Sequence, residues 1–111
     1  MSDLENYREL LEPCGTVVAS ALIDSQGVAE SILHRKELLG IWPAKTFKAS
    51  VSFFDVAQKA GLDSRFLQID LSGGYLYAFS DTAGSSLAVL TKAEELPYEI
   101  VRKLVERFCV D

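Results

Sequence analysis

Apolar residues recur along this chain with helical period in some segments and with strand period in others. Leu4, Tyr7, Leu10 and Leu11 form one stripe at helical spacing, which ends at residues 13–15, Pro-Cys-Gly. A similar stripe begins near the end of the chain, after Pro97, and consists of Ile100, Val101, Leu104, Val105 and Phe108. Each stripe leaves charged residues on its other side. The pattern therefore predicts two terminal amphipathic helices, each covering a core with one face.

Strand-like segments lie between these helices. They cover residues 17–23, 28–33, 66–71, 75–80 and 86–91. The segment 17–23 is apolar nearly throughout, so both of its faces should be covered and it should lie centrally in a sheet. Short turns containing glycine join 17–23 to 28–33 and also join the last three segments to one another. The sequence predicts a hairpin followed by a three-stranded antiparallel meander.

The segment 66–71 alternates between two faces. Phe66, Gln68 and Asp70 share one face, whereas Leu67, Ile69 and Leu71 share the other. This strand is long and lacks proline, and such a strand at a sheet edge is prone to pair with another chain.

The middle of the chain predicts a helix of a different kind, from Pro43 to the stop signal at residues 59–61, Lys-Ala-Gly. One apolar stripe consists of Phe47, Val51, Phe54 and Ala57, and a second consists of Ala49, Phe53, Val56 and Ala60. Together the stripes cover more than half of the helix circumference, whereas a helix lying on a sheet needs an arc of roughly 100°. A second surface must cover the excess. The predicted element order is α-β-β-α-β-β-β-α.

Composition and charge narrow the class of protein. The chain has 111 residues, which suits one domain over residues 1–111, and it is 49% hydrophobic and 24% charged, unlike a disordered segment. The net charge of −5 argues against nucleic-acid binding. No apolar run approaches a membrane span and no secretory signal is visible, so we expect a cytoplasmic location. There Cys14 and Cys109 are expected to be buried free thiols.

Chemical motifs are sparse. The sequence contains no phosphate-binding loop, dinucleotide fingerprint or nucleophile elbow, and it has a single histidine, His34, expected in a surface loop. Cys14, Cys109 and His34 lack the spacing of metal ligands. We expect Asp24, Asp70 and Asp81, at or near strand ends, to bond turn backbone. We therefore predict no catalytic, cofactor-binding or metal-binding residue, and no enzymatic activity.

Two further groups have ordinary structural interpretations. We interpret the pairs Arg35-Lys36 and Lys45 with Lys48 as solvated faces, although either pair could contact phosphate. The aromatic residues that alternate along one strand, Tyr75, Tyr77 and Phe79, are expected to form core beneath a helix.

Several local motifs resemble the roadblock family of dynein-light-chain-like domains. They are the Pro-Cys-Gly of residues 13–15, the Asp-x-x-Gly turn of 24–27, the alanine- and phenylalanine-rich middle helix, the Gly-Tyr-Leu-Tyr of 74–77, the strand region 84–91 and the Val-Arg of 101–102. The resemblance implies an α+β fold with a five-stranded antiparallel sheet of order 2-1-5-4-3. The first and last helices would cover one face, with Cys14 and Cys109 at their ends in an arrangement that would allow a bridge without predicting one.

The resemblance also implies a function. Roadblock-like domains are non-enzymatic homodimers whose middle helices pack together and whose third strands pair edge to edge, and bacterial members resemble regulators of a Ras-like GTPase. The residues expected at the dimer interface are Phe47, Val51, Phe54, Phe66, Gln68, Ile69 and Asp70. We expect the Phe47 stripe to face outward, with the Phe53 stripe as the alternative. A second hypothesis is a profilin- or PAS-like ligand-sensing domain with a pocket beside Tyr75, Tyr77 and Phe79.

Overall fold

The computed structural model describes residues 3–62, 65–81 and 83–109. In chain order the elements are α1 (Asp3–Leu11), β1 (Val17–Ile23), β2 (Ala29–His34), α2 (Ala44–Lys59), β3 (Phe66–Leu71), β4 (Gly74–Ser80), β5 (Ser86–Lys92) and α3 (Tyr98–Phe108). The predicted element order is confirmed, and the strand bounds differ from the prediction by one residue at most. None of the helices in the described part is long and apolar enough to cross a bilayer.

The strands form an antiparallel sheet in the order β2-β1-β5-β4-β3, which confirms the predicted fold class. β1 pairs with β2 on one side and with β5 on the other, so the continuous apolar run of this strand is explained by burial on both faces. β3 pairs with β4, and among the described residues no strand pairs with its outer edge.

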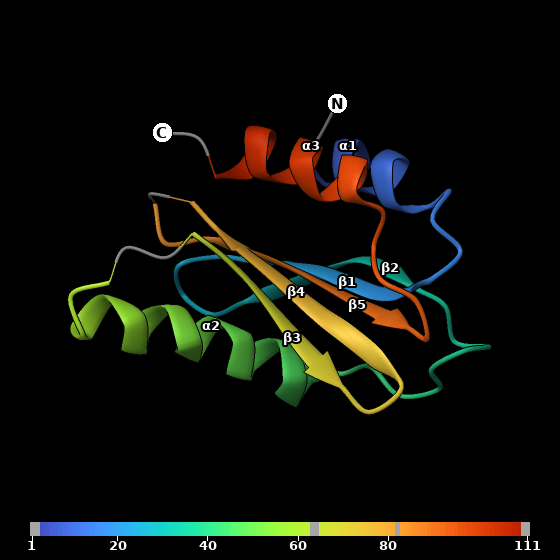
Figure 1. The fold of residues 1–111 in the computed structure, drawn as a ribbon, viewed down its shortest axis with the longest axis horizontal. Helices are drawn as coiled ribbons and strands as arrows, with labels where there is room; N and C mark the ends of the chain where they lie inside the picture. Colours follow the sequence, from blue (N-terminus) through green and yellow to red (C-terminus); the bar gives the residue numbers. More distant parts are fainter. Residues whose placement is uncertain (1–2, 63–64, 82, 110–111) are drawn as a thin grey trace.

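The helices form two layers on opposite faces of the sheet (Figure 1). α1 and α3 lie side by side on one face, and α2 crosses the other. The core beneath α1 and α3 is built from large side chains, including Tyr77, Phe79, Leu87 and Leu104. The core beneath α2 has a floor of small residues, Ala19, Ala21 and Ala88, which lets the helix lie close to the sheet.

The predicted turns form as the sequence indicated. The Asp24 carboxylate oxygen Oδ1 accepts hydrogen bonds from the backbone N–H groups of Gln26 and Val28, both at 2.9 Å. Gly27 has a φ of 84°, a conformation that glycine adopts without steric cost. Asp81 plays the same part at the β4–β5 turn, where its Oδ1 accepts from two backbone N–H groups at 2.9 Å. Thr82, within that turn, lies outside the described residues.

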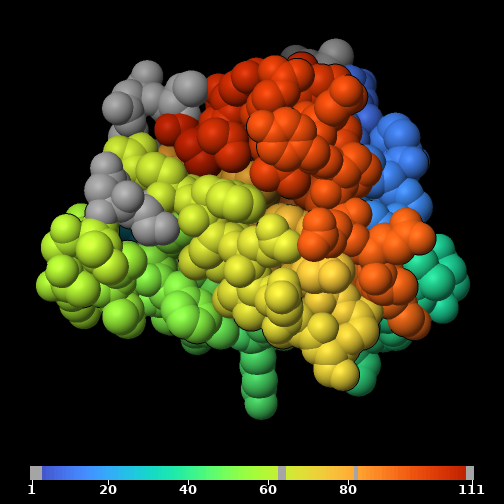
Figure 2. Space-filling view, viewed as in Figure 1, coloured from blue at the N-terminus to red at the C-terminus, as the bar shows by residue number. Residues whose placement is uncertain are grey.

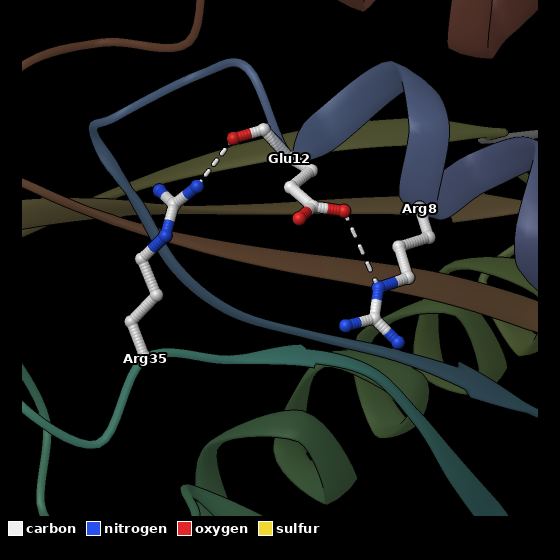
Figure 3. Close-up of polar contacts among 3 residues, drawn as sticks. All are labelled: Arg8, Glu12 and Arg35. Atoms are coloured by element: carbon white, nitrogen blue, oxygen red, sulfur yellow. Dashed lines mark hydrogen bonds and ion pairs between the residues drawn. The ribbon is translucent and has the colours of Figure 1, made fainter.

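Arg35, just after β2, ties the end of α1 to the sheet (Figure 3). Its guanidinium donates hydrogen bonds to the backbone carbonyls of Cys14 at 2.7 Å and Val17 at 2.8 Å, and to that of Glu12. The interpretation of Arg35 as part of a solvated face is therefore wrong. A cation beside these carbonyls satisfies groups that the end of α1 and the following turn leave without intrahelical partners. Lys36, in contrast, is exposed as predicted.

Candidate functional site

The outward face of α2 is apolar and exposed. Phe53 is 54% exposed and Val56 is 63% exposed. Ala49 and Ala60 lie on the same face and are also exposed. Monomeric proteins rarely leave neighbouring large apolar side chains in water, so this face has the character of an interaction surface.

The opposite face of α2 packs on the sheet. Phe47 is 1% exposed, and Val51 packs against the same core cluster as Phe47. Val56 is nine residues beyond Phe47, which places it about 180° away around the helix axis. The expected outward orientation of the Phe47 stripe is therefore wrong, and the alternative stripe, which contains Phe53, faces outward. Phe47 is held in place by Trp42, whose ring lies 5.3 Å from that of Phe47 in an edge-on arrangement.

The outer edge of β3 lies at the surface beside this helix. Figure 2 shows β3 and β4, in yellow, exposed between α3 above and α2 below. The Ser80 N–H donates to the Arg65 carbonyl at 2.8 Å, so Arg65 and Ser80 form a hydrogen-bonded pair. Because such pairs alternate in an antiparallel ladder, the backbone N–H and C=O groups of Gln68 and Asp70 point away from β4. Both residues are exposed.

The other residues predicted for the dimer interface are less accessible within one chain. Phe66 packs on the core beneath α1 and α3, and its ring centroid lies 5.0 Å from that of Phe79. Ile69 packs on the core beneath α2. Phe54 is half-buried and lines a groove, described next. The role of Phe54, Phe66 and Ile69 in a dimer therefore stays a prediction.

A groove of about 740 Å³ lies between the C-terminal half of α2 and the end of the sheet. Its wall on the α2 side includes Val51, Phe54 and Leu62, and its wall on the sheet side includes Arg65 and Ser80. The remaining lining residues described by the structure are Asp55, Gln58, Gly61, Asp81, Ala83, Gly84 and Ser86. Sequence reasoning missed this groove because its lining comes from segments far apart in the chain.

The aromatic strand residues do not line this groove. Tyr77 is buried beneath α1 and α3, as predicted for core, and its hydroxyl accepts a hydrogen bond from the Leu96 N–H at 2.8 Å. Burial raises the pKa of Tyr77 above its ordinary value, an effect that the hydrogen bond from Leu96 opposes. Phe79 is fully buried and Tyr75 packs beside them. The described lining of the groove thus gives no support to the hypothesis of a ligand-sensing pocket beside these aromatic residues.

His34 and the cysteines occupy structural positions. The His34 nitrogen Nε2 lies 2.7 Å from the Leu39 carbonyl oxygen, and its ring packs edge-on against Trp42. Cys14 and Cys109 are free thiols, and burial raises the pKa of each. The thiol of Cys14 contacts the Leu10 carbonyl. The C-terminal ends of α1 and α3 lie at opposite ends of their layer (Figure 1), so the expectation that Cys14 and Cys109 lie in an arrangement that would allow a bridge is wrong. Across the described residues, no three His, Cys, Asp or Glu side chains gather as a metal site.

The protein has an α+β fold of the roadblock type. This fold is defined by the sheet order, by the paired terminal helices on one face and by the lone middle helix on the other. Comparison with solved structures bears this out. The chain is similar to a Roadblock/LC7 domain from Streptomyces avermitilis, with 20% sequence identity, a TM-score of 0.67, and coverage of 95% of this chain and 91% of that chain. The resemblance found in the sequence is thus confirmed for the fold.

Two further solved structures are similar. MglB of Myxococcus xanthus has 14% identity and a TM-score of 0.63, and the match covers 96% of this chain and 84% of that chain. Another Roadblock/LC7 domain structure from Streptomyces avermitilis has 18% identity and a TM-score of 0.58, with coverage of 96% and 94%. No family model matches the sequence, and no curated protein matches it.

Proposed function

We propose that this chain is a cytoplasmic, non-enzymatic binding module, a single roadblock-like domain over residues 1–111 that forms a homodimer and engages a small Ras-like GTPase or a related signalling protein. The observation that carries the proposal is the outward apolar face of α2, where Phe53 and Val56 are more than half exposed. Helix α2 covers its own sheet with the Phe47 side alone, so the Phe53 side is available for a second copy.

The edge of β3 supports the same arrangement. Gln68 and Asp70 direct backbone groups away from β4, and an antiparallel second copy of β3 would satisfy them. In this dimer the two sheets become continuous and the two α2 helices pack beneath the junction. Phe53, Val56, Gln68 and Asp70 are then the central contacts, with Phe54, Phe66 and Ile69 supporting them from within each copy.

The first experiment measures mass in solution by light scattering. We expect a particle of twice 12.2 kDa for the wild type. Phe53→Glu places a charge in the centre of the helix contact and should give monomers. Tyr98→Glu is the matched control, because Tyr98 is 77% exposed and lies on α3, on the other face of the sheet. A monomeric wild type, or a Phe53→Glu chain that stays dimeric, would refute the proposed dimer.

A second experiment tests the strand contact. Gln68→Pro removes a backbone N–H that points away from β4, so the hydrogen bonds between β3 and β4 stay intact. Ile69→Pro removes an N–H that points toward β4 and should destabilise the fold itself. We expect Gln68→Pro to keep its circular dichroism spectrum and thermal transition while its dimer dissociation constant rises at least tenfold. An unchanged dissociation constant would show that β3 does not pair across the dimer.

The GTPase partner follows from the family resemblance, in which bacterial roadblock-like domains resemble regulators of a Ras-like GTPase. The test uses purified Ras-like GTPases of the same organism, each loaded with GDP or with a non-hydrolysable GTP analogue. Binding that differs between the two nucleotide states supports the proposal. If a chain shown to be dimeric binds none of these GTPases, the partner assignment is overturned. The proposed dimer is unaffected by that result.

A further inference from the structure

β2 forms the edge of the sheet opposite to β3, and its outer side pairs with no other strand among the described residues. The Asp24 N–H donates to the Val28 carbonyl at 3.0 Å, so that carbonyl points toward β1. Because the direction of the backbone groups alternates along an antiparallel ladder, the N–H and C=O groups of Ala29 and Ser31 point away from β1. Both residues are exposed. This β2 edge can therefore accept an added strand.

The usable part of the β2 edge is short. The register of β1 and β2 shifts between Ser20 and Ala21, and Ile32 is the extra residue of a β-bulge at this point. A bulge interrupts the regular ladder and bends the strand that carries it. Ile32 and Leu33 are buried. An added strand therefore pairs with residues 28–31 alone, and its side chains must supply the specificity that a long ladder would otherwise give.

Two exposed side chains lie on one face of the β2 edge. Glu30 pairs with Leu22, which packs on the core beneath α1 and α3, so the Glu30 side chain lies on that face of the sheet. Val28 precedes Glu30 by two positions and shares this face, where it is 60% exposed. Glu30 makes no ion pair with any residue that the structure describes. One apolar and one acidic side chain are thus available to an added strand.

Charge selects the kind of strand that the β2 edge accepts. Opposite charges on paired strands stabilise the pairing, whereas like charges directly opposite each other destabilise it. β2 carries Glu30, β3 carries Asp70, and neither edge strand contains lysine or arginine. A second copy of β2 that paired through Ala29 and Ser31 would place the two Glu30 carboxylates opposite each other. A strand of another protein with a basic residue is therefore more complementary than a second copy of this chain.

We propose that the β2 edge binds an extended segment of a different protein, which carries a lysine or arginine opposite Glu30 and an apolar residue beside Val28. Hydrogen bonds from the backbone of Ala29 and Ser31 supply the affinity, and the two side chains supply the specificity. The inference goes beyond the proposed function, because the proposed dimer uses α2 and β3 and leaves β2, at the other edge of the sheet, free (Figure 1).

The experiment titrates the intact chain with two peptides and follows backbone amide NMR signals and amide hydrogen exchange. The basic peptide is N-acetyl-Val-Thr-Lys-Thr-Val-amide, and the acidic peptide has glutamate in place of lysine. We expect a dissociation constant of order 1 mM for the basic peptide and about fivefold weaker binding of the acidic peptide. The N–H groups of Ala29 and Ser31 should exchange more slowly in the complex, because both would donate to the peptide.

Two variants test the assigned contacts. Glu30→Lys should reverse the preference, so that the acidic peptide binds more tightly than the basic peptide. Glu95→Lys is the matched control, because Glu95 is an exposed glutamate in the segment before α3 and its replacement should leave the preference unchanged. Ser31→Pro removes an N–H that points away from β1 and keeps the hydrogen bonds between β1 and β2. It should weaken binding of the basic peptide at least tenfold.

Four results would overturn the proposal. They are no binding of the basic peptide at about 20 mM, equal binding of the two peptides, an unchanged preference in Glu30→Lys, and unaltered affinity in Ser31→Pro. Slower exchange at Gln68 and Asp70 in place of the β2 residues would assign the peptide to β3 and also overturn it. Self-association that Ser31→Pro abolishes would assign the β2 edge to a second copy of the chain, with the same consequence. The effect of Phe53→Glu on mass tests the proposed dimer independently of these results.

Discussion

Arg35→Met should destabilise the fold substantially, although Arg35 lies outside the core. Arg35 donates to three backbone carbonyls, at 2.7 Å for Cys14, at 2.8 Å for Val17 and to Glu12. Hydrogen bonds to a charged group contribute about 1.5–3 kcal/mol each, but they are not additive. The Glu12 carbonyl is exposed and regains water, so the two part-buried carbonyls dominate. We expect a loss of about 2–4 kcal/mol in the free energy of unfolding.

The matched control lies in the same view (Figure 3). Arg8 makes one ion pair with Glu12, at 3.4 Å between exposed side chains, and such pairs contribute about 0–1 kcal/mol. Urea unfolding followed by circular dichroism measures both variants. With a slope of about 1–3 kcal/mol per molar urea, Arg35→Met should lower the midpoint by about 1–2 M. If Arg35→Met and Arg8→Met unfold within about 0.5 kcal/mol of each other, the role assigned to Arg35 is refuted.

Two further predictions concern a close backbone approach and a half-buried thiol. A Cβ atom on Gly74 would lie 2.2 Å from the Thr91 carbonyl oxygen, so Gly74→Ala should cost about 3 kcal/mol or more, measured by urea unfolding. Gly73→Ala, in open space at a φ of 85°, should cost about 1 kcal/mol, and equal losses would contradict the clash. Burial raises the pKa of Cys109, so iodoacetamide should label it more slowly than a free thiol at pH 7.5. Labelling should speed up about tenfold per pH unit up to the raised pKa, and a rate equal to that of free cysteine would contradict burial.

Local periodicity was sufficient to predict the elements and the position of β1. A strand that is apolar on both faces needs neighbours on both sides, and β1 has them in β2 and β5. The turn residues were equally informative, because the role of Asp24 in its turn depends only on residues two and four positions further on. These features are local, and local patterns specify them.

The orientation of α2 could not be predicted in the same way. Both of its stripes contain phenylalanine, and their hydrophobicity is similar. In the structure, Phe47 packs beside Trp42 over the floor of Ala19, Ala21 and Ala88, so its stripe faces the sheet. This complementarity involves strands that are distant in the sequence.

The roles of Arg35 and of the groove were missed for a related reason. The carbonyls that Arg35 contacts lie 18 to 23 residues earlier in the chain. The sheet side of the groove joins Arg65, which precedes β3, with Ser80 of β4 and Ser86 of β5. The sequence of a pair such as Arg35-Lys36 does not indicate which of the two side chains will bind backbone carbonyls. Only the register of the strands brings each residue to its partners.

The apolar area exposed on α2 indicates why the proposed dimer needs both α2 and β3. Phe53 and Val56 together present roughly 200 Å² of apolar surface at their observed exposures, against about 800 Å² per partner in a stable interface. Burying this surface on two copies would contribute about 10 kcal/mol, and association costs about 4–15 kcal/mol. The helix contact alone is therefore marginal. Strand pairing must supply the remaining area and fix the alignment, which is why a charge at Phe53 should dissociate the dimer while proline at Gln68 should weaken it.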